Sequence, residues 1–200
     1  YVVGRGKWEK LACLNCLELN CTFYRLPSQR LINSLDRLPP NVNLIIKASQ
    51  HITHSLRLNN AEDAWNVLWG KIKDLNALKC VLFQLPPNFN NTDINKQRIL
   101  DMADYLPQNI DIAFEFRNKS WLVEDTYTMF EKLGWGIVGT VVIKREGTRW
   151  VGNMPSGIYM PPPTTNFNYI RIHGKKRWRG KLTANQLSEI HKIVSSQKVK

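Results

Sequence analysis

The sequence predicts an α/β fold in which parallel strands form a (β/α) barrel, and three observations favour it. Apolar, strand-like stretches alternate with helix-like stretches along the chain. The connections are long enough for the crossover that joins two parallel strands, which needs about a dozen residues or more. Several strands also carry polar residues near their C-terminal ends on one face and apolar residues on the other.

The first quarter of the chain predicts a strand, a helix and a second strand. Residues 17–23 form an apolar strand-like stretch. A proline–serine turn then precedes a helix over residues 29–37, which Pro39 and Pro40 end because proline cannot continue a helix. Residues 42–49 are expected to form the second strand.

The middle of the chain repeats this order. Residues 61–78 predict a helix with one buried stripe, since apolar residues recur at spacings of three and four; these are Trp65, Leu68, Trp69, Ile72 and Leu75. Residues 80–85 predict a strand that Pro86 and Pro87 close, residues 93–105 predict a helix, and a further strand begins at Asp111.

The last part predicts two more strands and two more helices. A helix is expected over residues 123–133, a strand over 136–143, a strand over 168–173 and a final helix over 183–195. Residues 145–163 are rich in Gly and Pro, and no regular structure is predicted there. Thr183 is suited to capping the last helix.

Five of the predicted strands have one polar face and one apolar face. Residues two apart on a strand share a face, so Ala113, Glu115 and Arg117 oppose Ile112, Phe114 and Phe116. The same division recurs in four other strands, whose polar faces carry Glu18 and Asn20, Lys47 and Ser49, Gln84, and Arg171 and His173. A barrel explains this pattern, because barrel sites are assembled from the C-terminal ends of several strands while the outer face packs on helices.

An open, doubly wound sheet is the alternative architecture. Both faces of its strands would be apolar, and it would commonly carry a Gly-rich phosphate loop between a strand and a helix. No such loop is present in the sequence. A solvated sheet edge would also give an alternation of Glu and Arg on a single strand, but it does not explain agreement among five strands.

Composition places the chain among globular proteins with a single domain over residues 1–200. It is 43% hydrophobic and has a net charge of +12, which favours anionic partners such as phosphorylated small molecules or nucleic acid. No apolar run is long enough to span a membrane, and no membrane partner is expected. Four cysteines are too few and too clustered for a disulfide scaffold, which favours a reducing, cytoplasmic compartment.

Part of the positive charge is concentrated in one segment. Residues 174–181 contain five Lys and Arg residues and Trp178. A basic segment with an aromatic residue suits contact with phosphates and stacking on bases. The same composition is also that of an ordinary surface loop, so both interpretations stay open.

Five motifs recur at the strand ends and in the turns that follow them. They are Glu18 to Pro27, Lys47 with Ile52-Thr53-His54, Leu82 to Pro87, Glu115-Phe116-Arg117 with Ser120-Trp121, and Tyr169 to Gly174. In type and order these motifs, which cover roughly residues 16 to 185, resemble the YecE-like family, the domain of unknown function DUF72. The resemblance implies a TIM-type barrel, and it implies less about function, because one barrel fold hosts many chemistries.

The chain departs from the family pattern at both ends. Family members open with a strand that ends in a Gly-Thr-Ser-Gly-Trp type motif, and residues 3–8 are a degraded form of it. The final family strand, with an aromatic-Asn-Asn type ending, is missing beyond Lys200. With no initiator Met, the sequence is expected to be part of a longer chain and the barrel to be incomplete at both ends.

The strand ends predict a site of mixed charge. The candidate catalytic residues are Glu115, His173, Glu18 and Lys47, and the candidate substrate-binding residues are Asn20, Tyr24, Gln84, Arg117, Trp121 and Arg171. The cationic side chains would hold a phosphate or carboxylate, and a glutamate would move a proton. Histidine is the side chain that ordinarily titrates near neutrality. A network of buried ion pairs that serves only stability is the alternative.

Other chemistries are less favoured by the sequence. Lys47 has a place suited to a Schiff base, but nothing in the sequence shows that it is neutral. Cys13, Cys16 and Cys21 lack a further Cys or His pair at zinc-ligand spacing, so buried thiols are expected instead. His51 and His54 lie in a loop, and His54 either caps that loop or joins the site. Neither a metal nor a cofactor is expected.

The sequence thus favours a barrel with a metal-free polar site for an anionic substrate, with hydrolysis, elimination or isomerisation as the chemistry. The alternative is a nucleic-acid-binding barrel without turnover, which would bind through the site and the basic segment 174–181.

Overall fold

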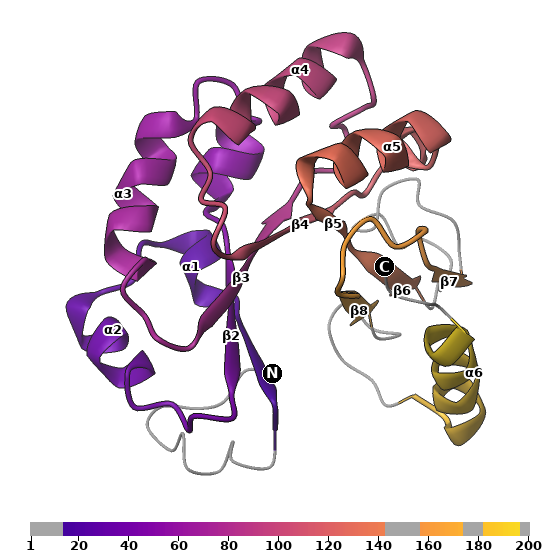
Figure 1. Cartoon of the computed structure of the whole chain (residues 1–200), viewed down its shortest axis with the longest axis horizontal. Coiled ribbons are helices and arrows are strands. Elements are labelled where there is room, and N and C mark those ends of the chain that lie inside the picture. Colours follow the sequence, from indigo (N-terminus) through magenta and orange to yellow (C-terminus); the bar gives the residue numbers. More distant parts are fainter. Residues whose placement is uncertain (1–13, 143–156, 174–181, 197–200) are drawn as a thin grey trace. The chain divides into compact units, whose positions relative to one another are not determined.

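Figure 1 shows the computed structural model of the chain, which describes residues 14–142, 157–173 and 182–196. These residues fall into two compact units. Unit 1 lies within Tyr1–Gln84 and Lys96–Ile112, and unit 2 lies within Leu85–Asn95 and Ala113–Lys200.

The described strands form two sheets. One is a parallel sheet in the order β1-β2-β3-β4-β5, and the other has three strands in the order β7-β6-β8. In the second sheet β6 is parallel to β8 and antiparallel to β7. The strands are β1 (Cys16–Leu19), β2 (Asn43–Lys47), β3 (Leu78–Gln84), β4 (Asp111–Glu115), β5 (Gly136–Ile137), β6 (Gly139–Val142), β7 (Gly157–Tyr159) and β8 (Ile170–His173). The predicted mixed α/β fold with a parallel sheet is confirmed, but within the described ranges the five-stranded sheet is open rather than closed into a barrel.

Four helices of unit 1 lie between its first three strands in the sequence, as the colours of Figure 1 show. They are α1 (Cys21–Tyr24), α2 (Gln29–Leu35), the π-helix η2 (His51–Ser55) and α3 (Glu62–Ile72). The Ser28 hydroxyl accepts a hydrogen bond from the Leu31 amide and so caps α2, as expected of a serine before a helix. The predicted stripe of α3 is buried, since Trp65, Leu68 and Ile72 have no exposed surface.

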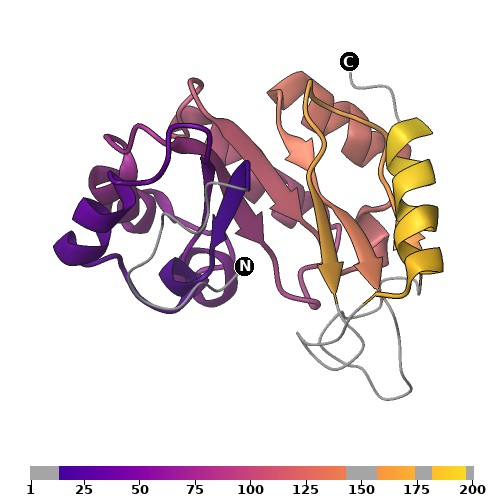
Figure 2. The ribbon, with the colours of Figure 1, turned by 90° about the horizontal axis from the view of Figure 1, so that it is seen from below.

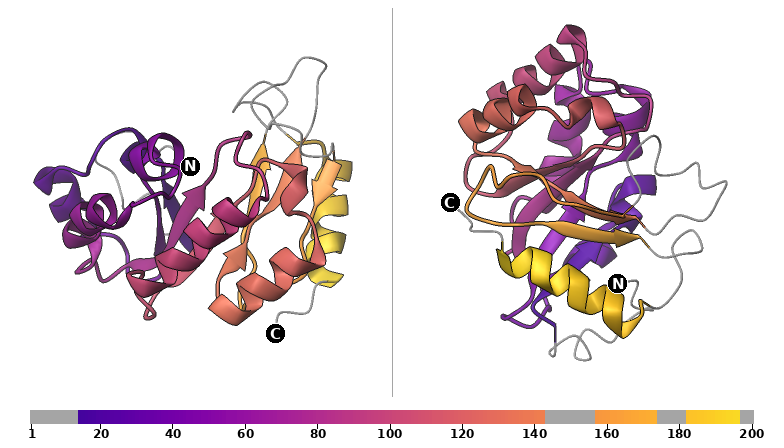
Figure 3. Two further views of the ribbon diagram at one scale, coloured as in Figure 1. Left: turned by 90° about the horizontal axis from the view of Figure 1, so that it is seen from above. Right: turned by 90° about the vertical axis from the view of Figure 1, so that its right-hand side faces the viewer.

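The segment after β3 contains α4 (Asp93–Asp101) and the short 3-10 helix η3 (Met102–Asp104). Most of α4 and all of η3 belong to unit 1. The helices of unit 2 are the 3-10 helix η4 (Lys119–Trp121), α5 (Glu124–Leu133) and α6 (Ala184–Ser196). Gly134 ends α5 in the left-handed conformation, with φ of 66°, which glycine adopts without steric cost. Figures 2 and 3 show α6 running alongside the three-stranded sheet of the same unit.

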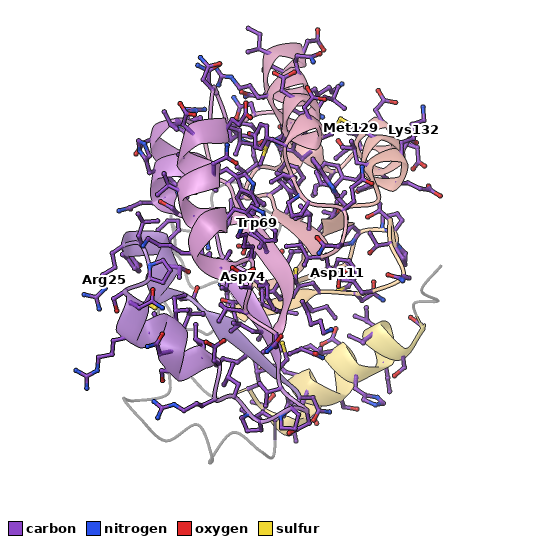
Figure 4. All side chains as sticks on the ribbon, turned by 60° about the vertical axis from the view of Figure 1, so that its left-hand side comes forward. Arg25, Trp69, Asp74, Asp111, Met129 and Lys132 are labelled. Carbon is purple, nitrogen blue, oxygen red and sulfur yellow. The ribbon has the colours of Figure 1, made fainter. Side chains whose placement is uncertain are left out.

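Long polar side chains lie on the outward faces of the helices. In Figure 4 the Lys132 side chain on α5 and the Arg25 side chain after α1 extend away from the ribbon, and both residues are exposed. No helix within the described ranges is both long and apolar enough to cross a membrane.

The observed strands differ from the predicted ones at three places. The first strand ends at Leu19 rather than residue 23, because Cys21–Tyr24 turn into the helix α1. The strand predicted over residues 136–143 is divided into β5 and β6, which belong to different sheets. The strand β7 lies inside the Gly- and Pro-rich stretch where no structure was predicted.

Candidate functional site

Glu115 is the centre of an ionic cluster in unit 2. It is the last residue of β4 and is fully buried, with 0% exposure. The Nε of Arg117 donates to its Oε1 at 3.0 Å, and Nη1 of Arg171 donates to its Oε2. His173 Nε2 lies 3.4 Å from Oε1, beyond the ordinary range of a hydrogen bond. Four of the predicted site residues thus meet, and the term Glu115 cluster is used below for Glu115, Arg117, Arg171 and His173.

Strand geometry explains why these residues meet. Arg171 and His173 are two apart on β8 and therefore share a face. The opposite face of β4 is apolar, with Phe114 stacked on Trp135 and in edge contact with Phe130 of α5. The apolar packing fixes the strand, and the alternation of side chains turns Glu115 to the other side.

The pKa of Glu115 reflects two opposing effects. Burial raises the pKa, because a buried carboxylate loses its hydration. The positive charges of Arg171 and Arg117, together with contact to His173, outweigh burial and hold the pKa of Glu115 well below its usual range. Glu115 is therefore ionised at neutral pH, which makes it a weak base and a partner that orients cations rather than a group that gives up a proton.

A second polar group lies in unit 1 around Lys47. The Lys47 side chain is buried, its Nζ donates to Oε1 of Gln84 at 2.7 Å, and it lies 3.9 Å from the centre of the Phe23 ring. An amide oxygen and an aromatic face both favour a charged ammonium. The contacts argue against the neutral amine that a Schiff base would need.

The other predicted residues of unit 1 are less enclosed. Asn20 donates from Nδ2 to Oε1 of Glu18 at 2.6 Å, so these two are neighbours. Tyr24 is 71% exposed, and its ring makes an edge contact with Phe23. Tyr24 therefore lies on the surface of α1, because the chain turns into a helix after Asn20 instead of continuing as a strand.

His54 is held beside Thr53 at the end of the π-helix η2. The Thr53 hydroxyl lies 3.1 Å from the Ser49 carbonyl oxygen and 2.9 Å from His54 Nδ1, and the His54 tautomer sets which group donates in the second contact. The His54 ring also makes an edge contact with Phe23, on whose ring Lys47 lies.

Trp121 is part of the core instead of the ionic cluster. It is 1% exposed and stacks on Phe116 and Phe89, and its Nε1 donates to the Phe89 carbonyl at 2.7 Å. The structure thus gives Trp121 a packing role that the alternation of residues along β4 did not reveal.

The cysteines also differ from expectation. Cys16 is exposed and Cys21 is partly exposed, whereas only Cys80 of the three described thiols is buried. The prediction of buried thiols is therefore wrong for Cys16, and Cys21 lies on a helix rather than on an apolar strand face. The described residues bring together no cluster of three His, Cys, Asp or Glu side chains suited to a metal ion. Cys13 and the basic segment 174–181 lie outside the described residues.

Two further polar residues lie near the cluster's strands and were missed by the sequence reasoning. Thr140 on β6 is 3% exposed, and Tyr159 on β7 shares a 2.5 Å contact between hydroxyls with Tyr127 of α5. The pKa of Tyr159 is raised, first by burial and then by the bond to Tyr127. Thr140 could have been identified by extending the comparison of strand faces to residues 136–143.

The fold has close counterparts among solved structures. A DUF72 family protein of Enterococcus faecalis matches with a TM-score of 0.76 and 17% identity, over 94% of this chain and 79% of that one. A DUF72 family protein of Thermotoga maritima matches with a TM-score of 0.71 and 22% identity, over 94% of this chain and 76% of that one. At these identities the likeness shows the fold alone. No curated protein matches the chain.

The sequence itself carries the family assignment. The family model described as "Protein of unknown function DUF72" matches residues 11–199, which is nearly the whole chain. The resemblance inferred from the five motifs is confirmed, and the chain belongs to the DUF72 family.

Proposed function

We propose that this protein is a (β/α) barrel whose Glu115 cluster binds a small anionic, phosphorylated substrate and acts on it as a hydrolase or lyase. The observation that carries the proposal is the charge of the cluster. Among its four side chains, two guanidinium groups surround one carboxylate, so positive charge is in excess even when His173 is neutral.

Burial makes this excess significant. The side chains of Arg117 and Arg171 are only 8% and 12% exposed, and charges removed from water are costly unless they are compensated. A bound anion would add a further negative charge beside these two guanidinium groups. Arginine suits this role, because its fork of N–H donors can contact a carboxylate on one side and a phosphate oxygen on another.

The roles of the residues follow from the chemistry of each group. Glu115, being ionised, orients the two arginines. His173 is the proposed acid or base, since hydrolysis and elimination both require a proton transfer and a stabilised oxyanion. Lys47 and Glu18 stay proposed site residues on the barrel hypothesis, because barrel sites draw on the C-terminal ends of several strands.

An ion-pair network that serves only stability is the competing account. It predicts that the protein binds no anion at this place. Nucleic-acid binding is the other outcome to be distinguished, and the net charge of +12 is the observation behind it.

A thermal-unfolding panel tests the proposal. The wild type is heated with inorganic phosphate, phosphorylated sugars, dicarboxylates and short oligonucleotides, at low and high salt. A ligand that binds only the native state raises the Tm, by an amount set by its concentration relative to Kd. The proposal expects a small phosphorylated compound to raise the Tm of the wild type.

Two matched arginine variants show whether the ligand that raises the Tm binds at the Glu115 cluster. Arg171→Gln should abolish the shift, whereas Arg25→Gln removes the same charge from the exposed residue seen in Figure 4 and should retain it. A shift given only by oligonucleotides and lost at high salt would favour the nucleic-acid account. The absence of any shift by small anions would contradict the proposal.

A further inference from the structure

The hydroxyl of Thr140 is an unexplained polar group in the core of unit 2. The residue is 3% exposed, and no described group forms a hydrogen bond with its Oγ1. Burying a hydroxyl without a partner is unfavourable, and buried polar groups are rarely left unsatisfied. A valine of the same shape would pack there without that penalty, so the hydroxyl requires a reason.

The strand register places Thr140 beside Arg171, a member of the Glu115 cluster. Thr140 lies on β6, the central strand of the three-stranded sheet, and is paired with Arg171 of β8. Paired residues on neighbouring strands share a face. Since Arg171 contacts Glu115, Thr140 lies on the same face of the sheet as the cluster.

The residue paired with Thr140 on the other neighbouring strand, β7, is polar too. Thr140 is paired with Tyr159 of β7, so its row across the sheet consists of Tyr159, Thr140 and Arg171. The Tyr159 hydroxyl is occupied by Tyr127 and the Arg171 guanidinium by Glu115. Thr140 is therefore the member of this row whose polar atom has no described partner.

We infer that Thr140 is a ligand contact of the Glu115 cluster and donates its hydroxyl hydrogen to an oxygen of the bound anion. This inference rests on the proposed function. It also narrows the substrate class. A carboxylate has two oxygens, which one arginine fork can satisfy, whereas a further donor on the adjacent strand suits the three terminal oxygens of a phosphoryl group. The structure thus favours a phosphate ester over a simple carboxylate.

The variant Thr140→Val tests the inference through two readouts. Without ligand, its Tm should rise by about 2–4 °C, because a methyl group replaces an unsatisfied hydroxyl. In calorimetric titrations, its Kd for inorganic phosphate should be about tenfold weaker than that of the wild type. Its Kd for malonate, a carboxylate probe, should change less.

Thr164→Val is the matched control. Thr164 is also buried, but its hydroxyl donates to the Trp135 carbonyl at 2.7 Å. Its replacement should lower the Tm, because the carbonyl loses its partner, and should leave phosphate affinity unchanged. Thr140→Ser keeps a hydroxyl and should retain phosphate affinity, which provides a second variant if Thr140→Val does not fold.

The outcomes separate this inference from the proposed function. If the wild type binds phosphate and Thr140→Val binds it equally well, the inference is overturned while the anion site stands, and a buried water would then account for the hydroxyl. If the wild type binds neither phosphate nor malonate, the proposed function itself fails. A fall in Tm for Thr140→Val would also contradict the inference, since it would show that the hydroxyl already has a stabilising partner.

Discussion

Replacing Glu115 by Gln should destabilise the protein strongly, because the carboxylate compensates two arginines. Their side chains are 8% and 12% exposed, so removing the negative charge leaves two largely buried cations beside a neutral amide. Breaking a buried ion pair in this way costs about 3–5 kcal/mol. For a chain of this size, this corresponds to a fall in Tm of about 6–20 °C.

Urea unfolding followed by circular dichroism measures this loss directly. Glu189→Gln is the matched control, since Glu189 is an exposed residue on α6 and its replacement should change the free energy of unfolding by less than about 0.5 kcal/mol. A loss below about 1 kcal/mol for Glu115→Gln would refute the argument that the carboxylate holds the cluster together.

The same variant carries a pH signature. The folded pKa of Glu115 is depressed below the unfolded value of about 4.3. The stability that ionised Glu115 contributes is therefore present above about pH 4.3, and it is lost as pH falls through the pKa of Glu115 in the folded protein. The wild type should lose stability in acid below about pH 4.3 more steeply than Glu115→Gln. Equal acid slopes for the two proteins would contradict a depressed pKa.

Three further changes test other contacts, each by urea unfolding. Lys47→Met should cost about 1–3 kcal/mol, because a charge-assisted hydrogen bond to the buried oxygen of Gln84 is lost, and an unchanged midpoint would mean that this bond contributes nothing. Ser28→Ala should cost about 1 kcal/mol through loss of the cap of α2, with Ser28→Asp expected to restore most of it. Gly136→Ala should be destabilising, since its Cβ would lie 2.8 Å from the Phe167 ring, and Phe167→Leu in the same chain should relieve the clash.

Much of the ionic cluster could be predicted from strand alternation alone. The period of two put Glu115 with Arg117, and Arg171 with His173, on common faces, and these four residues do meet. On β4 alternation works because the opposite face is fixed by aromatic packing of Phe114. On β8 the alternation holds without such packing, since Ile172, which lies between Arg171 and His173, is 46% exposed.

The same reasoning failed where local contacts override alternation. Residues 17–23 look like one strand, yet the chain turns after Leu19, and the Thr22 hydroxyl then donates to the Lys47 carbonyl at 2.7 Å. That contact joins residues far apart in the sequence, so no local pattern reports it. The turn is what brings Tyr24 to the surface.

Trp121 and Thr140 show two other limits of prediction from a single sequence. The role of Trp121 depends on stacking against Phe89, a residue from a different loop, and tertiary stacking has no signature in a single sequence. Thr140 did have a signature, since the comparison of strand faces can be extended to its predicted strand, and the structure adds that its hydroxyl has no described hydrogen-bond partner. Such an absence can be seen only in a structure.

The measurement that tests the central claim most directly is the ratio of the phosphate dissociation constants of Arg171→Gln and Arg25→Gln, obtained by calorimetric titration at one salt concentration. Both variants lose one positive charge, so their long-range attraction for anions is matched. If the Glu115 cluster binds the anion, loss of a charge-assisted contact should weaken binding by Arg171→Gln by about 10- to 100-fold relative to Arg25→Gln. A ratio near one would contradict the claim that the cluster is an anion site. The claim would also fail if none of the three proteins, the wild type included, bound phosphate.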